Sequence, residues 1–339
     1  MQKFRNTILC GDCIEILRQA PAAFADLIFA DPPFNIGYQY DRYCDKVEKN
    51  NYIAWTRDWM SACLDVLKPD GSFYIAIGDD YAAHVRIIGD ELGLTLRNWI
   101  IWHYTFGQQT RSKFARAHTH IFYFVKNKDK YTFNDEAIRV LSDRQKIYKD
   151  KRANPLGKLP DDVWNEFPRV CGTFDEREHW HPCQMPESLL ARIIRASTNP
   201  HEWVLDPFSG SGTTCVVANK LNRFYTGIDI SPYYVEEAKK RVQFSEGQPI
   251  EGEVPPKWNS HFDSELKWLY HENKITTEEF ENNEILLNLF ADKFNLRIGA
   301  VAVPYHPKDI LKRLITLRKS GKLGPLQRKT KNTSLFEGG

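Results

Sequence analysis

VLDPFSGSGTTCVVA, at residues 204–218, joins an apolar run, a glycine-rich turn and the start of a helical pattern. The apolar run ends in an acid at Asp206, and Gly210 and Gly212 come just before the helical pattern at Thr213. A strand, a glycine turn and a helix in this order are typical of a doubly wound sheet, where such turns lie at the carboxyl ends of the strands and bind ligands. The two glycines let the backbone approach a ligand, and the helix start at Thr213 offers unpaired N–H groups.

Short apolar runs alternate with helical patterns on both sides of this stretch. Strand-like runs bounded by turn signals occur at 25–31, 72–79, 98–104, 120–126, 202–206 and 224–230. Helical patterns occur at 51–67, 80–92, 186–197, 213–221 and 232–242. Residues 1–245 are therefore predicted to form one α/β domain, with a doubly wound, mostly parallel sheet covered by helices on both faces.

The composition changes after residue 245. Residues 246–258 contain prolines and glycines without periodicity, which indicates a linker. We expect a small helical C-terminal region at 259–339 with a basic tail, since 308–331 carries nine Lys and Arg against one acid. A second DNA contact, a dimer element and a solvated surface are all compatible with that tail.

The overall composition indicates a soluble cytoplasmic protein. The formal net charge is only +2, so any affinity for nucleic acid must come from local patches. The seven cysteines are scattered, which fits a reducing compartment. No apolar stretch has the length of a membrane span or a secretory leader.

A second stretch, FADPPFNIGY at 29–38, carries a buried-strand pattern directly into an acid and two prolines. One interpretation is a strand that stops at a rigid turn. The other is that the chain presents the Asp31 carboxylate, a carbonyl fixed by the prolines and an aromatic face to a flat ligand.

The acid Asp229 ends the strand that follows the helix of the glycine turn. A carboxylate at this place commonly accepts hydrogen bonds from ribose hydroxyls, so an adenosine-bearing cofactor is predicted. The GxGxxG spacing and the P-loop lysine are both absent from the turn, which counts against NAD and ATP.

Together these motifs resemble the S-adenosylmethionine-dependent DNA amino-methyltransferases, which modify exocyclic nitrogens of bases. DPPF precedes the glycine turn, which is the order of the family's permuted beta class. The resemblance spans most of 7–242 and includes GDCIEIL (11–17), RSKFARAHTHIFYFVK (111–126), HPCQMPESLLARII (181–194) and GIDISPYYVEEAKKR (227–241).

The resemblance implies a role for each residue of DPPF. The Asp31 carboxylate and the Pro32 carbonyl would accept the hydrogens of the target amine, so that the nitrogen turns its lone pair toward the sulfonium methyl. Pro33 would stiffen the turn, and Phe34, where Tyr is commoner, would stack on a base flipped out of the duplex. Transfer would be direct, without a covalent enzyme intermediate.

The resemblance also assigns the cofactor contacts. Asp206 and Phe208 would lie near the methionine moiety, Gly210, Gly212 and Thr213 along its path, Asp229 on the ribose and Asp12 near the adenine. Met185 stands where the family usually has lysine.

The long basic stretch 127–180 interrupts the alternation, so we expect an insertion without sheet structure. The family places target recognition here, with Lys and Arg on phosphates and polar side chains on base edges. The implied partner is double-stranded DNA, and a homodimer and a cognate restriction endonuclease are further partners known in the class.

Several alternatives stay open at this point. Cytosine-N4 enzymes share the geometry but more often carry Ser ahead of Pro-Pro, so Asp31 favours adenine N6. A methyltransferase-like DNA-binding subunit without activity and an RNA or protein-glutamine methyltransferase are further alternatives, although the last group usually carries Asn before Pro-Pro.

No metal is predicted. The potential zinc ligands Cys171, His179, His181 and Cys183 match no common finger spacing. Pro182-Cys183 resembles the nucleophile of cytosine-C5 enzymes but lies outside a catalytic-strand context. His118 and His120 lie on an apolar strand and are expected to be structural, with lining of the base pocket as a further role.

Overall fold

The computed structural model describes residues 2–108, 110–140, 157–172, 176–251, 258–298 and 304–326, with the single positions 142, 144, 148, 152, 154, 253 and 255. The chain divides into two compact units. The first comprises Met1–Ile138 and Pro160–Glu253, and the second Arg139–Leu159 and Val254–Gly339. Much of the predicted insertion between 141 and 156, and the end of the basic tail beyond 326, lie outside the described residues.

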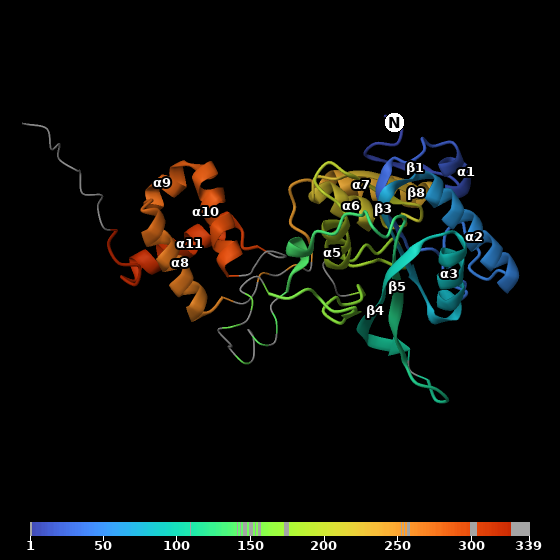
Figure 1. The fold of residues 1–339 in the computed structure, drawn as a ribbon, viewed down its shortest axis with the longest axis horizontal. Coiled ribbons are helices and arrows are strands. Elements are labelled where there is room, and N and C mark those ends of the chain that lie inside the picture. Colours follow the sequence, from blue (N-terminus) through green and yellow to red (C-terminus); the bar gives the residue numbers. More distant parts are fainter. Residues whose placement is uncertain are drawn as a thin grey trace, which may run out of the picture. The chain divides into compact units, whose positions relative to one another are not determined.

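The first unit is built on an eight-stranded sheet with the strand order β1-β8-β7-β2-β3-β5-β4-β6 (Figure 1). Its strands are β1 (Thr7–Cys10), β2 (Ala25–Ala30), β3 (Leu67–Ile77), β4 (Thr95–Gln108), β5 (Arg116–Val125), β6 (Val163–Trp164), β7 (Trp203–Asp206) and β8 (Phe224–Asp229). Only β5 runs antiparallel to its two neighbours, β3 and β4, and every other neighbouring pair is parallel. The predicted mostly parallel sheet is confirmed.

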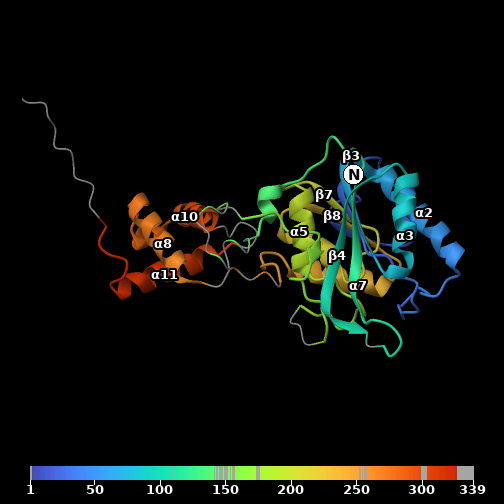
Figure 2. The same ribbon diagram turned by 60° about the horizontal axis from the view of Figure 1, so that its bottom comes forward.

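Helices cover both faces of this sheet (Figures 1 and 2). The core on one face includes α1 (Cys13–Arg18), α2 (Lys49–Val66) and α3 (Asp79–Glu91). The other face is covered by α5 (Glu187–Ser197), α6 (Thr213–Lys220) and α7 (Pro232–Phe244), and a short 3-10 helix, η1 (Asp135–Ile138), follows β5. The predicted doubly wound α/β architecture is therefore confirmed as well.

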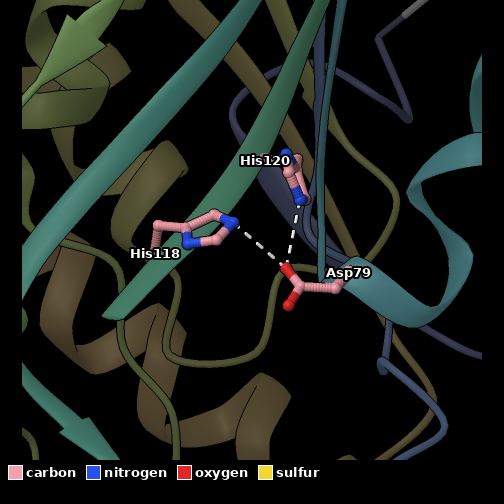
Figure 3. A group of neighbouring side chains, drawn as sticks. All are labelled: Asp79, His118 and His120. Atoms are coloured by element: carbon pink, nitrogen blue, oxygen red, sulfur yellow. Dashed lines mark hydrogen bonds and ion pairs between the residues drawn. The ribbon is translucent and has the colours of Figure 1, made fainter. Parts of the chain in front are cut away.

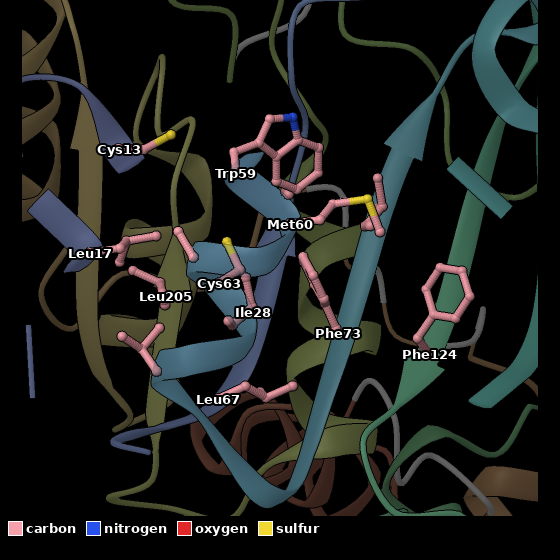
Figure 4. Close-up of a cluster of buried hydrophobic side chains, with 14 of the residues drawn as sticks. Cys13, Leu17, Ile28, Trp59, Met60, Cys63, Leu67, Phe73, Phe124 and Leu205 are labelled. Carbon is pink, nitrogen blue, oxygen red and sulfur yellow. The ribbon is translucent and has the colours of Figure 1, made fainter. Parts of the chain in front are cut away.

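The strands are apolar throughout because both of their faces are buried. Ile28 and Phe73 pack on the α2 side with Trp59 and Met60 (Figure 4). Their chain neighbours point the other way, and Leu27 belongs to the core that includes α5.

Two distant parts of the chain meet at the centre of the sheet. β2 and β7 are parallel neighbours, with Leu27 opposite Val204 and Ile28 opposite Leu205. Because the strands run in the same direction, the segments that follow Ala30 and Asp206 emerge at the same edge of the sheet.

The expectation that 127–180 lacks sheet structure is wrong at one place. The two-residue strand β6 pairs in parallel with β4 at the sheet edge, with Val163 opposite Ile101. Trp164 is buried there, and Trp102 donates its indole N–H to the carbonyl of Phe167 at 2.8 Å. Burial of large side chains thus fixes a strand too short to leave a sequence pattern.

The first unit also extends past the predicted boundary at 245. Ile250 is buried in the core on the α5 face. Glu251 donates its backbone N–H to Glu187 at 3.0 Å, and Glu253 forms an ion pair with Arg195.

The second unit contains the helices α8 (Ser260–Asn273), α9 (Thr277–Asn282), α10 (Glu284–Arg297) and α11 (Pro307–Lys319), which share a hydrophobic core. α11 overlaps the basic stretch 308–331 of the sequence, and Ile310, Leu311, Leu314 and Leu317 are its buried residues. Arg313 pairs with Asp263 at 2.6 Å, and Arg318 with Glu278 at 2.8 Å, so acids within the unit neutralise part of its charge. In the described part of the chain, no helix is both long and apolar enough to cross a membrane.

Candidate functional site

A cavity of about 200 Å³ lies at the carboxyl edge of the central strands of the first unit. Its walls include eight of the predicted site residues: Asp12, Asp31, Pro33, Asp206, Phe208, Gly210, Thr213 and Asp229. Pro32, Phe34 and Gly212 are not among the lining residues. The fold therefore brings the segment after β2 and the glycine turn after β7 to one space.

The glycine turn has a shape that requires glycine. Gly210 and Gly212 have φ angles of 48° and 76°, in the left-handed region. A Cβ at Gly212 would lie 2.8 Å from the Cβ of Ala238 on α7, and a Cβ at Gly210 would lie 2.8 Å from Nε2 of His181. Gly212 thus serves the packing of the turn on α7, whereas Gly210 lines the cavity beside His181.

Asp229, at the end of β8, is tied to the glycine turn. Its carboxylate accepts the N–H of Gly210 at 2.9 Å and that of Ser231 at 2.8 Å. Burial raises the pKa of Asp229, and these two hydrogen bonds oppose the rise. Each carboxylate oxygen has a second acceptor position, so Asp229 can still accept a ligand hydroxyl.

Asp12 is the N-cap of α1, and its Oδ1 accepts the N–H groups of Ile14 at 2.9 Å and Glu15 at 3.1 Å. Capping and a place on the cavity wall are compatible, because α1 begins at the carboxyl end of β1. The sequence resemblance indicated only the second role.

Asp31 directly follows β2, Asp206 is the last residue of the adjacent strand β7, and both line the cavity. Burial raises the pKa of Asp31 to about 7, and the nearby Asp206 carboxyl adds to the rise. Burial likewise raises the pKa of Asp206 to about 7, against hydrogen bonds from Thr214 and from the N–H of Phe208. Two buried acids that repel each other favour a cationic ligand, because a positive charge between them stabilises both carboxylates.

The loop after Asp31 is held by a residue that the sequence did not single out. Asp45 is buried, and its carboxylate accepts the N–H groups of Asn35 at 2.6 Å, Ile36 at 3.2 Å and Tyr38 at 2.9 Å. Tyr52 donates its hydroxyl to the carbonyl of Pro33 at 2.6 Å. No local pattern reveals Asp45, because its partners become neighbours only when the loop closes.

Phe34 packs beside the site rather than in its wall. A Cβ added at Gly78, the residue before α3, would lie 3.2 Å from the Phe34 ring. Glycine at this position therefore leaves room for the ring next to the N-terminus of α3.

Aromatic side chains that the sequence did not single out complete the cavity wall: Tyr40, Tyr43, Trp55 and Tyr234. The Trp55 ring lies 5.6 Å from that of Phe208, centroid to centroid. Flat apolar walls of this kind suit a planar ring system.

A buried charge cluster supports the glycine turn from the α7 side. Arg241 donates to the carbonyl of Ser211 at 3.1 Å and to Oγ1 of Thr213 at 2.8 Å. Glu187 holds Arg241 at 3.1 Å and Lys220 at 2.7 Å, and its side chain is 3% exposed. The HPCQMPE element thus acts on the turn through Glu187.

Asp79, His118 and His120 are not among the residues that line the cavity. Figure 3 shows the three side chains pointing toward one another. In the described parts of the chain they form the one group of three His, Cys, Asp or Glu ligand atoms within 4.8 Å of each other. Asp79 Oδ1 lies 3.2 Å from Nε2 of His118 and 3.1 Å from Nε2 of His120. The four potential zinc ligands noted between 171 and 183 do not gather in such a group.

Hydrogen bonding accounts for this cluster without a metal. Trp99 donates its indole N–H to Nδ1 of His120 at 2.9 Å, so the proton of neutral His120 sits on Nε2 and is donated to Asp79. Arg116 Nε lies 2.8 Å from the other carboxylate oxygen of Asp79. We infer that the cluster anchors β5 to the start of α3.

The cavity fits an adenosine cofactor that carries a positive charge. Asp229 has acceptor capacity for a hydroxyl, the aromatic walls suit a base, and the acids Asp31 and Asp206 suit a cation. S-adenosylmethionine has the corresponding three groups, which are ribose hydroxyls, an adenine base and a cationic sulfonium sulfur.

Comparisons with known proteins agree with this arrangement. The model of the N6/N4 DNA methylase family matches residues 25–240. The type II methyltransferase M.HpaI of Haemophilus parainfluenzae is 39% identical over 236 residues, which are 69% of this chain and 73% of that protein. The DNA adenine methyltransferase YhdJ of Escherichia coli strain K12 is 38% identical over 245 residues, 70% of this chain and 82% of that protein.

Solved structures share the fold. The cytosine-N4-specific PvuII DNA methyltransferase has a TM-score of 0.53 at 20% identity and covers 73% of this chain and 93% of its own. A putative DNA modification methylase of Thermus thermophilus, in complex with S-adenosyl-L-methionine, has a TM-score of 0.52 at 21% identity and covers 72% and 95%.

Fold and family match together define an S-adenosylmethionine-dependent DNA methyltransferase. The resemblance found in the sequence is thereby confirmed. The chain belongs to the N6/N4 DNA methylase family.

Proposed function

We propose that this protein methylates the N6 amine of adenine within a short sequence of double-stranded DNA. The observation that carries the proposal is that Asp31 shares one cavity with the glycine turn and Asp229. The acceptor for the target amine and the cofactor site are thereby adjacent. Asp ahead of Pro-Pro favours adenine over cytosine, and the E. coli relative at 38% identity is named a DNA adenine methyltransferase.

Each side of the cavity has its own proposed task. When bound, the cofactor supplies an electrophilic methyl group on a sulfonium sulfur. Asp229 would hold the ribose, Asp12 would lie near the adenine, and Phe208 and Gly210 would border the methionine moiety. Thr213 and Gly212 shape the turn that carries Gly210.

Asp31 and the Pro32 carbonyl would activate the target. An exocyclic amine is a poor nucleophile because its lone pair is delocalised into the ring. Two acceptors for its hydrogens turn the lone pair out of the ring plane toward the methyl group. Asp31 also accepts the proton that the nitrogen gives up as the new N–C bond forms, and orientation supplies much of the acceleration.

Phe34 would stack on the flipped base, and Pro33 would keep the loop rigid. The carbonyl of Pro33 is already held by Tyr52, and Asp45 holds the backbone just beyond Phe34. These contacts support a clamp whose shape exists before DNA binds.

We further place target recognition in the stretch 127–180 and expect a cytoplasmic enzyme. The H. parainfluenzae relative is named a type II methyltransferase, which supports a partnership with a restriction endonuclease. A homodimer is the expected assembly by the resemblance to the beta class.

The deciding experiment is long-read sequencing with base-modification detection. Plasmid DNA is taken from a methylation-deficient host that expresses the protein, beside an Asp31→Ala control. N6-methyladenine in one short motif, absent from the control, supports the proposal. N4-methylcytosine in such a motif would overturn the choice of base, and unmodified DNA from folded protein would overturn the activity.

A further inference from the structure

The hairpin between β4 and β5 carries an aromatic side chain that nothing in the catalytic proposal uses. Phe114 is 99% exposed, the highest value among the exposed large hydrophobic residues of the described chain. Figures 1 and 2 show the hairpin extending away from the helices of the first unit. A single exposed aromatic needs no explanation in itself, so its surroundings decide the argument.

Two cations precede Phe114 in the hairpin tip. Arg111 and Lys113 are both exposed at the hairpin tip, within three residues of Phe114. The tip is also folded: Lys113 donates its N–H to Oγ1 of Thr110 at 3.3 Å, and the Thr110 hydroxyl donates to the Lys113 carbonyl. An exposed aromatic ring beside two cations on a shaped turn suits DNA, whose phosphates are negatively charged and whose bases stack on rings.

The stem of the hairpin is fixed to the protein. Gln108 pairs with Arg116 across the two strands. Arg116 binds Asp79 at 2.8 Å and Asp80 at 3.3 Å at the start of α3, and His118 adds a contact to Asp79 (Figure 3). These contacts hold the stem of the hairpin, and with it the tip, at the start of α3.

The start of α3 also lies next to the DPPF loop that carries Phe34. Asp79 directly follows Gly78, which leaves room for the ring of Phe34. β5 runs antiparallel to β3, with Ile77 opposite His120, so the hairpin leaves the sheet at the edge where the carboxyl ends of β2, β3 and β7 lie. The hairpin tip and the cavity therefore lie at the same edge of the sheet.

We propose that the tip, residues 110–115, is a DNA-contacting arm, with Arg111 and Lys113 on phosphates and the Phe114 ring inserted into the base stack beside the flipped base. This inference rests on the proposed function. An apolar wedge offsets the stacking that a duplex loses when a base leaves it, so it lowers the cost of flipping. Lysine and arginine contacts to phosphates add affinity that falls with salt.

The test compares Phe114→Ala with Phe244→Ala, a matched exposed phenylalanine (80% exposed) at the end of α7. The probe is a duplex with the motif found by modification sequencing, made once with the target base paired and once with an abasic site opposite it. We expect Phe114→Ala to lower kcat/KM about tenfold or more on the paired duplex and to regain most of the rate on the abasic duplex. S-adenosylhomocysteine affinity should be unchanged, and Phe244→Ala should behave as wild type on both duplexes.

Three results would overturn the wedge. Phe114→Ala could match Phe244→Ala on the paired duplex, lose the same factor on both duplexes, or lose cofactor affinity. A 2-aminopurine base at the target position gives an independent reading, because its fluorescence rises on flipping and should rise less with Phe114→Ala.

The phosphate contacts are tested by binding alone. Arg111→Gln and Lys113→Gln should each lower the slope of log K against log salt by about 0.9 on duplex DNA. If the wild type methylates no duplex, the proposed function fails, while this binding measurement still decides whether the hairpin is a DNA arm. Unchanged slopes in both variants would contradict the arm.

Discussion

At Asp31 the requirements of stability and of the proposed chemistry oppose each other. The carboxyl is buried beside Asp206, which raises its pKa to about 7 from an ordinary value of about 3.9. The folded state thus favours the protonated form. Its stabilising contribution is present at low pH and is lost as the pH rises through about 7, whereas the carboxylate that takes up the amine's proton must be ionised.

The first prediction concerns pH. The methylation rate at low cofactor concentration should fall as the pH decreases through about 7, because protonated Asp31 cannot take up the proton that the target amine gives up. A saturating concentration of cationic cofactor should move the midpoint to lower pH. A pH series of initial rates measures both, and a midpoint that moves upward with cofactor would contradict the assignment.

Substitution of Asp31 should separate stability from activity. Asp31→Asn keeps the shape and removes the buried charge, so at pH 8 we expect unfolding free energy equal to or above that of wild type. Methylation should fall about 100-fold or more, since the amide cannot accept in the same way. Urea unfolding and a methylation assay on one preparation measure both effects, and a clear loss of stability would refute the argument.

Asp45 should matter through the loop that it holds. Asp45→Ala leaves the N–H groups of Asn35, Ile36 and Tyr38 without their carboxylate, which should cost about 1–3 kcal/mol. We expect kcat to fall while S-adenosylhomocysteine affinity, measured by calorimetry, stays within about twofold. Asp58→Ala, an exposed acid on α2, is the control and should change neither quantity.

At the scale of elements, α7 reaches the glycine turn through Arg241. Arg241→Met removes the donors to Ser211 and Thr213 and leaves Glu187 with Lys220, so we expect a loss of about 3 kcal/mol in stability. S-adenosylhomocysteine should bind about tenfold more weakly. Lys240→Met, an exposed neighbour on the same helix, should leave both the stability and the affinity unchanged.

The central strands could be predicted from the sequence because burial on both faces makes them continuously apolar. The run 25–31 contains all of β2, and the helical pattern 232–242 marks α7 from its Ser231-Pro232 start. β6 and α1 are too short to show a period, and only buried contacts or a cap fix them.

The residues that line the cavity could be predicted from the sequence where a motif is local, and could not where the partners are distant in the chain. Asp31, Asp206 and Asp229 stand at strand ends, which chain topology alone brings to one edge. Asp45 and Glu187 contact segments of the site, but no spacing in the sequence links either residue to the segment that it holds. Trp55 lines the cavity from α2. The apolar pattern of this helix predicts which side chains pack toward the core, but it does not predict which ring faces a ligand.

At the scale of the whole molecule, the separate hydrophobic core of the second unit predicts two unfolding events. The helices of the second unit share their own core, apart from those of the first unit. S-adenosylhomocysteine at about 100 times its Kd should stabilise the first unit by about 2.7 kcal/mol and leave the second unmoved. Differential scanning calorimetry measures this, and one transition that shifts as a whole would contradict it.

The pairing of β2 with β7 has a consequence for protein synthesis. A ribosome completes the DPPF loop early, but the partner strand and its glycine turn appear only after most of the first unit has been made. Contacts this far apart in sequence form slowly. A nascent or prematurely terminated chain that ends before residue 203 therefore carries half a cavity and lacks the whole glycine turn.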